Sequence, residues 1–201
     1  DADVAEGAEW LALTCPHMAR ALQQTGALPL RRRSDGFSAV LHAIVSQQVS
    51  VASAQAIWAK LEHADMTRQV RVANASWDDL RALGLSRQKI RYANALAGAG
   101  INYEALRNLP DQHVIETLVK VPGVGVWTAE IYAMFSLGRA DVFAPGDLAL
   151  QEAARSLFDL EARPKPAELR EMAEDWSPWR SVAARLLFAY YRVIKQREGI
   201  T

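Results

Sequence analysis

The chain has 201 residues, half of them hydrophobic, so it is long enough for one sizeable globular domain or two smaller lobes. Its 23 basic residues balance its 23 acidic residues, which argues against a protein that binds nucleic acid through bulk charge alone. The single cysteine, Cys15, excludes an intrachain disulfide and a four-cysteine iron–sulfur cluster. No apolar run approaches the roughly 18 residues that would span a bilayer, so we expect no membrane partner.

Helical periodicity runs through the first half of the chain, and strand-like alternation is hard to find. An apolar face recurs at i, i+3 and i+4 over residues 37–45. Ser50 and Ser76 each stand where a helix N-cap is expected, because a serine side chain can accept a hydrogen bond from the first turn. The Gly-Leu-Ser turn at 84–86 leads into a further helix.

Four more helices are expected in the second half of the chain. They fit residues 111–120, 126–137, 147–158 and 179–194. The last has the clearest apolar stripe, with i, i+3, i+4 spacing over about four turns. The sequence therefore predicts an all-α protein of about ten helices joined by short links.

Charged residues are not spread evenly along this neutral chain. Basic residues gather at 31–33 and 87–91 and along 180–197, whereas 168–175 is acidic. Local basic patches on a neutral protein suit an enzyme that samples DNA and releases it, although each patch also fits an ordinary solvated surface.

Residues 118–129 read Leu-Val-Lys-Val-Pro-Gly-Val-Gly-Val-Trp-Thr-Ala, which predicts a helix, a tight turn and a second helix. Gly123 and Gly125 permit positive φ and a close approach of another backbone. Unpaired N–H groups at the start of the second helix, near Val126, lie at the positive end of its dipole. Such a turn can bind a phosphate without a basic side chain, or it can simply connect two helices.

A second segment of interest is Pro145-Gly146-Asp147, where the chain breaks and a new helix begins. Taken alone, Asp147 is an N-cap. Its position downstream of the two-glycine turn adds a second interpretation, in which Asp147 is a functional carboxylate.

These segments resemble the helix–hairpin–helix (HhH-GPD) DNA glycosylase superfamily, and within it the AlkA-type DNA-3-methyladenine glycosylases. The resemblance extends from about residue 35 to residue 195. It includes the string His-Ala-Ile-Val-Ser-Gln-Gln-Val-Ser at 42–50, the turn from Gly84 to Lys89 and Trp-Arg-Ser at 179–181. With so little chain before residue 35, we expect the glycosylase core without an extra N-terminal β-rich domain.

The resemblance implies a single HhH-GPD domain over 1–201, made of two helical lobes with an active-site cleft between them and no iron–sulfur cluster. One lobe would span 37–145, with six helices and the hairpin at 114–136. The other would combine residues 1–36 with residues 146–201.

The family's hairpin binds the DNA backbone. The resemblance implies that Gly123 and Gly125 donate backbone N–H groups to a phosphate and that Thr128 contributes its hydroxyl. It also implies a monovalent cation, Na⁺ or K⁺, at the hairpin in the DNA-bound form, with no other cofactor. The ligands of that cation would be the backbone carbonyls of Val119, Val121 and Val124.

The family's catalytic aspartate falls on Asp147. A carboxylate there would stabilise the oxocarbenium-like sugar as the glycosidic bond breaks, or activate the attacking water. The bifunctional relatives carry a Schiff-base lysine in the hairpin, at the position that Trp127 occupies here. Tryptophan is not a nucleophile, so the resemblance implies a monofunctional enzyme.

A flipped base needs a pocket, and the gap that it leaves needs a wedge. Trp127 is expected to form one pocket wall, because an aromatic face attracts a cationic base. Phe188 lies off the apolar stripe of its helix and stands where the family has tryptophan, while Ile131 would make the pocket less polar. Gln48, with Gln47, would fill the gap. Core packing for the aromatic residues and a simple helix end for the glutamines are the alternatives.

The expected function is base-excision repair of alkylated purines such as 3-methyladenine and 7-methylguanine, by hydrolysis of the N-glycosidic bond. An oxidised-base glycosylase/lyase of the same superfamily and a non-catalytic DNA-binding module are the alternatives. We expect double-stranded damaged DNA as the partner of a monomer, in the cytoplasm (at a bacterial nucleoid) or in a nucleus. The four histidines have no metal-ligand spacing, so no zinc site is expected.

Overall fold

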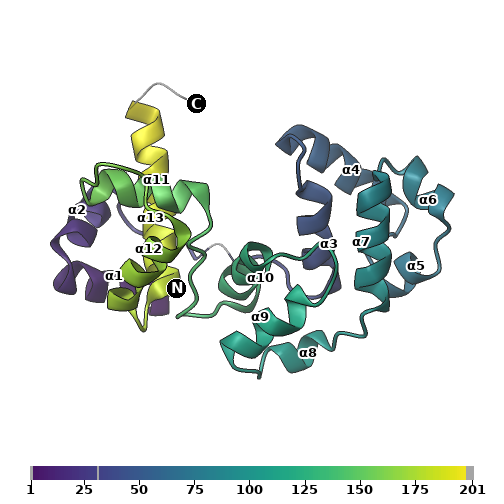
Figure 1. Ribbon diagram of the computed structural model, residues 1–201, viewed down its shortest axis with the longest axis horizontal. Helices are drawn as coiled ribbons and strands as arrows, with labels where there is room; N and C mark the ends of the chain where they lie inside the picture. Colours follow the sequence, from purple (N-terminus) through teal and green to yellow (C-terminus); the bar gives the residue numbers. More distant parts are fainter. Residues whose placement is uncertain (1, 31, 198–201) are drawn as a thin grey trace. The chain divides into compact units, whose positions relative to one another are not determined.

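The computed structural model describes residues 2–30 and 32–197, and Arg31 of the first basic cluster lies outside those ranges. All regular secondary structure in the described residues is helical, as the sequence predicts (Figure 1). The described part of the chain has thirteen α-helices, more than the ten expected, because short ones such as α5 (Gln69–Ala73) and α8 (Tyr103–Leu106) leave little periodic signal.

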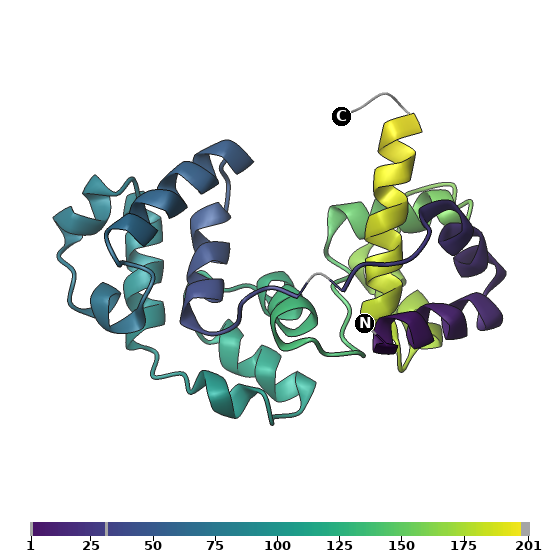
Figure 2. The ribbon, with the colours of Figure 1, turned by 180° about the vertical axis from the view of Figure 1, so that it is seen from behind.

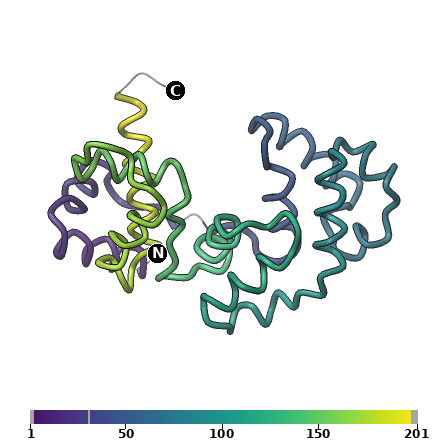
Figure 3. Tube along the Cα trace, viewed as in Figure 1, coloured from purple at the N-terminus to yellow at the C-terminus, as the bar shows by residue number. Residues whose placement is uncertain are grey.

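The chain divides into two compact units, residues 33–137 in one and residues 1–32 with 138–201 in the other. We call the first the hairpin unit and the second the terminal unit. The trace shows that the terminal unit combines the first and last parts of the sequence (Figure 3). None of the helices over the described residues is long and apolar enough to cross a membrane.

The hairpin unit is built around α3, which packs against α4, α7 and α10. Two opposite views show α3 and α7 side by side (Figure 1 and Figure 2). The predicted apolar face of α3 forms the core, since Val40, Leu41, Ile44 and Val45 are all buried. Besides α5 and α8, the α-helices of this unit are α3 (Phe37–Ser46), α4 (Val51–His63), α6 (Trp77–Ala82), α7 (Arg87–Gly98), α9 (Asp111–Val119) and α10 (Val126–Tyr132).

Serine caps start three of these helices. The side chains of Ser50 and Ser76, both predicted as N-caps, accept hydrogen bonds from the backbone N–H groups of Ser53 and Asp79 at 3.2 and 3.1 Å. Ser86 caps α7 in the same way. The helix predicted over 126–137 is α-helical only to residue 132 and continues as a π-helix over Ala133–Leu137.

The terminal unit is built around α13 (Arg180–Arg197), which packs against α1, α2 and α11. Its predicted apolar stripe is the core of the unit, and Ala183, Leu186 and Leu187 are completely buried. The other helices of the unit are α1 (Ala2–Thr14), α2 (Pro16–Thr25), α11 (Leu148–Leu157), α12 (Pro166–Met172) and the 3-10 helix Ala173–Trp176.

The segment 138–145 is held against the start of α13. Asp141 accepts hydrogen bonds from Arg180 Nε at 2.8 Å and Nη2 at 2.9 Å. The Ser181 hydroxyl donates to the carbonyl of Val142 at 2.7 Å. These bonds group the segment with the terminal unit, although we had expected it in the lobe over 37–145.

Candidate active site

The two hairpin glycines have different structural requirements. Gly123 has φ +92°, and a Cβ added there would lie 2.3 Å from Cγ of Tyr92. Gly125 has φ −85° and is the N-cap of α10, so its backbone does not use the positive φ that glycine permits. A Cβ at Gly125 would meet nothing within 4 Å. The open side of the turn is therefore at Gly125, whereas Gly123 is glycine because the Tyr92 ring packs against it.

Gly125 and the first two residues of α10 are exposed at the helix N-terminus. Val126 is 52% exposed and Trp127 is 45% exposed. The first N–H groups of a helix have no acceptor within it, so this end presents donors toward solvent. Thr128, by contrast, is only 6% exposed.

The three carbonyls expected to hold a cation lie in and next to the turn. Val119 ends α9, and the Val121 carbonyl accepts a hydrogen bond from the Val124 N–H at 3.0 Å. A carbonyl has two lone pairs, so that bond leaves Val121 able to contact an ion. Carbonyl oxygens are ligands that K⁺ takes in proteins, so these groups fit such an ion. No cluster of His, Cys, Asp or Glu suited to a metal occurs among the described residues.

The two glutamines after α3 have different environments. Gln47 is half-buried, and its Nε2 donates to the carbonyl of Gly123 at 2.9 Å. Gln48 is exposed and has φ +55°, the left-handed conformation. Gln48 is thus the residue of the pair presented to solvent, while Gln47 joins its loop to the hairpin.

A pocket of about 1010 Å³ lies in the hairpin unit and is lined by five of the site residues predicted there. Its α10 side is formed by Trp127, Thr128 and Ile131, and Gln47 and Gln48 line one end. The structure therefore brings the expected wedge residues and the expected pocket residues of this unit to one cavity.

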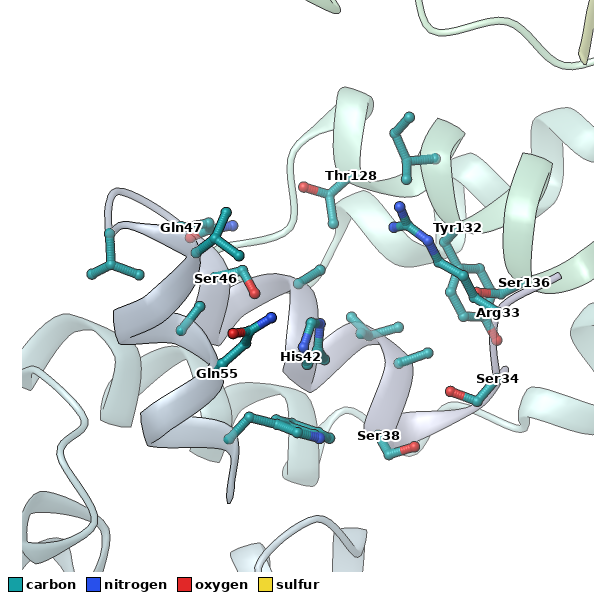
Figure 4. A pocket seen from close by; sticks show the side chains of 18 of the residues that line it. Arg33, Ser34, Ser38, His42, Ser46, Gln47, Gln55, Thr128, Tyr132 and Ser136 are labelled. Carbon is teal, nitrogen blue, oxygen red and sulfur yellow. The ribbon is translucent and has the colours of Figure 1, made fainter. Parts of the chain in front are cut away.

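The opposite side of this pocket includes polar side chains that were not anticipated from the sequence. His42 and Ser46 of α3 and Gln55 of α4 point into it (Figure 4). The His42 ring meets the Trp58 ring edge-on at 4.6 Å. Burial and the nearby Arg33 lower the pKa of His42, which favours a neutral imidazole. The i, i+4 spacing of His42 and Ser46 was the available signal, because it puts both on one face of a helix.

Asp147 is the N-cap of α11, as its position before a helix predicts. Its Oδ1 accepts hydrogen bonds from the N–H groups of Ala149 at 2.9 Å and Leu150 at 3.3 Å. The side chain is half-buried. These two bonds hold the carboxylate in one orientation, and a carboxylate can accept more bonds than two.

Phe188 is half-buried on α13, next to the fully buried Leu187, which agrees with its expected place off the apolar stripe. It belongs to the terminal unit together with Asp147, whereas Trp127, Ile131 and Gln48 belong to the hairpin unit. The predicted site residues thus form two groups, one in each unit.

Comparison with protein families gives a match to the model described as HhH-GPD superfamily base excision DNA repair protein, over residues 41–178. Among curated proteins, the chain is 26% identical over 165 residues to the putative DNA-3-methyladenine glycosylase YfjP of Bacillus subtilis, covering 76% of this chain and 58% of the relative. It is 30% identical over 171 residues to DNA-3-methyladenine glycosylase 2 of Escherichia coli, covering 78% of this chain and 57% of that protein. The chain thus spans little more than half the length of these two relatives.

Solved structures with the same fold include two 3-methyladenine enzymes. The DNA-3-methyladenine glycosidase of Bacillus halodurans has a TM-score of 0.83 and 27% identity, covering 92% of this chain and 88% of that one. Schizosaccharomyces pombe 3-methyladenine DNA glycosylase (Mag1), solved in complex with abasic DNA, has a TM-score of 0.74 and 26% identity, covering 86% and 89%.

Proposed function

The chain belongs to the HhH-GPD superfamily of base excision DNA repair proteins, and we propose that it is a monofunctional DNA glycosylase that removes alkylated purines. The relatives described above that are named 3-methyladenine DNA glycosylases or glycosidases support this substrate class. The observation that carries the proposal is the position of Trp127. This residue comes two positions after the second hairpin glycine, is 45% exposed and lines the pocket. A module that only bound DNA would not need an exposed aromatic there.

The substrate is a purine such as 3-methyladenine or 7-methylguanine in double-stranded DNA. Alkylation gives the base a positive charge, which makes it a good leaving group and attracts it to an aromatic face. The base leaves the helical stack to reach the pocket lined by Trp127 and Ile131. Gln48 fills the gap that the flipped nucleotide leaves.

Asp147 supplies the negative charge that the reaction needs. As the glycosidic bond breaks, the sugar becomes electron-poor, and a fixed carboxylate stabilises that centre electrostatically. The same carboxylate can orient the attacking water and accept its proton. The N–H groups of Ala149 and Leu150 hold Asp147 in place without requiring it to move during the reaction.

DNA binding relies on the hairpin. The backbone N–H groups at Gly123 and Gly125 donate to a phosphate, which explains how a chain with no net charge binds DNA. Thr128, which is buried, contributes its hydroxyl to the same phosphate contact. The carbonyls of Val119, Val121 and Val124 would hold Na⁺ or K⁺ in the DNA-bound form, adding positive charge next to the phosphate.

A base-release assay on methylated DNA tests this proposal. The expected result is free methylpurine, with strand breaks only after alkali, because a monofunctional enzyme leaves an intact abasic site. Strand breaks without alkali, with a covalent adduct trapped by borohydride, would instead indicate a glycosylase/lyase. Binding to abasic DNA without release of any methylpurine would indicate a non-catalytic binding module.

A further inference from the structure

The turn between α3 and α4 is connected by hydrogen bonds to two other parts of the hairpin unit. From one side, the ammonium group of Lys89 on α7 donates to the carbonyl of Val45 at 2.6 Å. From the other side, the Gln47 side chain donates to the carbonyl of Gly123 at 2.9 Å. Neither partner is close in sequence, so both bonds form only in the folded unit.

Lys89 is a buried cation with a specific structural partner. The residue is only 8% exposed, and burial lowers its pKa below the ordinary value for lysine. Val45 lies in the last turn of α3. The carbonyls of a last turn accept no hydrogen bond from an N–H group of the same helix, and they form the negative end of the helix dipole. An ammonium group there satisfies the carbonyl and fixes the position at which α3 ends.

Gln48, two residues after the end of α3, is in a conformation that needs such support. Gln48 has φ +55°, a backbone conformation that residues with a Cβ rarely adopt. Gln48 also lines both the pocket of about 1010 Å³ and a neighbouring groove of about 590 Å³ that contains Lys89, Tyr92 and Gly125. Gln48 therefore stands on the border between the two cavities.

We propose that Lys89 and Gln47 are positioning residues that hold the Gln48 turn against the hairpin, so that binding a phosphate at the hairpin and inserting Gln48 into the DNA are coupled. The proposal rests on the proposed function, in which Gln48 fills the gap beside a flipped nucleotide. A phosphate bound at the hairpin fixes the turn that contains Gly123. The Gln47 side chain then transmits that fixed position to the neighbouring Gln48.

The test measures DNA binding directly and does not depend on the damaged base. DNA with a tetrahydrofuran abasic-site analogue beside 2-aminopurine reports unstacking as a rise in fluorescence. Gln47→Met and Lys89→Met each remove the donor while keeping side-chain length. We expect both variants to bind undamaged DNA within about threefold of wild type, and their preference for the abasic DNA to fall at least about tenfold, with loss of most of the fluorescence rise.

Two comparisons separate positioning from general damage to the fold. Lys89→Arg keeps a cation at the Val45 carbonyl and should recover most of the preference lost in Lys89→Met. Gln112→Met removes an exposed glutamine of α9 whose side chain bonds to Glu116 in the next turn, at 2.9 Å, and should leave the preference unchanged. Melting curves confirm that each variant is folded.

The decisive variant combines Gln47→Met with Gln48→Ala. If Gln47 acts through Gln48, the double variant should lose no more abasic-site preference than Gln48→Ala alone. Additive losses would overturn the proposal, because Gln47 would then act independently of Gln48. Wild-type preference in Gln48→Ala would contradict the wedge in the proposed function. If Gln48→Ala keeps the wild-type abasic-site preference and Gln47→Met still loses it, Gln47 contacts DNA itself, and the positioning role is overturned as well.

Discussion

At the scale of single residues, the hairpin glycines are not equivalent. Gly123 has φ +92° with the Tyr92 ring against it, whereas Gly125 has φ −85° with open space around it. Gly123→Ala should lower the free energy of unfolding by about 2–4 kcal/mol, because alanine is strained at that φ and its Cβ displaces Tyr92. Urea unfolding measures the loss. Gly125→Ala is the matched control and should change stability by less than about 0.5 kcal/mol, so equal losses would contradict this difference.

Asp141 helps to hold the segment leading to Asp147 against the start of α13. Burial alone would raise its pKa, but hydrogen bonds from Arg180 and Ser177 outweigh that effect and lower the pKa below 3.8. A carboxyl group whose pKa is lowered by folding stabilises the protein above its unfolded-state pKa and loses that contribution as the pH falls through the folded value.

Asp141→Asn should therefore lower the free energy of unfolding by about 1.5–3 kcal/mol at neutral pH, the range for hydrogen bonds to a charged group. Denaturant titrations of wild type and variant at several pH values check this. The difference between the two proteins should be constant above the ordinary carboxyl pKa and shrink as the pH falls below 3.8. A difference that persisted unchanged in acid would show that the ion pair contributes little.

At the scale of elements, the N-terminus of α10 is the part of the hairpin that we expect to contact DNA. Gly125→Asp places a negative charge where the phosphate binds and should weaken DNA binding at least about tenfold. Gly125→Asn is the matched control, because it has nearly the same shape without the charge and should lose much less. Fluorescence anisotropy with a labelled duplex measures both. Equal affinities of the Asp variant and wild type would remove the hairpin from the DNA interface.

The start of a helix could be predicted from the sequence where a single residue caps that helix. Ser50, Ser76 and Asp147 each begin a helix because a short polar side chain can accept a hydrogen bond from the first turn. The sequence did not predict the π-helix over 133–137, because its residues fit the same apolar periodicity as an α-helix.

Contacts between distant parts of the chain could not be predicted from local patterns. The turn motif at 84–89 includes Lys89, but it does not predict that the ammonium group of Lys89 is buried against Val45. Likewise, Gln47 was expected to contact DNA, and its bond to Gly123 depends on the packing of α3 against the hairpin. The polar side chains of the pocket that include His42 and Gln55 also come from two helices together.

At the scale of the whole molecule, charge balance predicts how DNA binding responds to salt. With 23 basic and 23 acidic residues, the protein should neutralise few phosphates with cationic side chains. A plot of log affinity for undamaged duplex against log salt should therefore have a slope no steeper than about −4, since each neutralised phosphate contributes about −0.9. A slope of about −8 or steeper would show that basic clusters, rather than hairpin amides, dominate binding.

The catalytic assignment concerns Asp147, which belongs to the terminal unit. Asp147→Asn keeps the N-cap, because an amide oxygen can still accept hydrogen bonds from Ala149 and Leu150, so fold and stability should change little. Single-turnover release of 7-methylguanine by the Asp147→Asn variant, measured together with its affinity for abasic DNA, tests the account most directly. We predict a loss of release of at least about a thousandfold with affinity within about threefold of wild type. Release at the wild-type rate by a folded variant would contradict the role of Asp147.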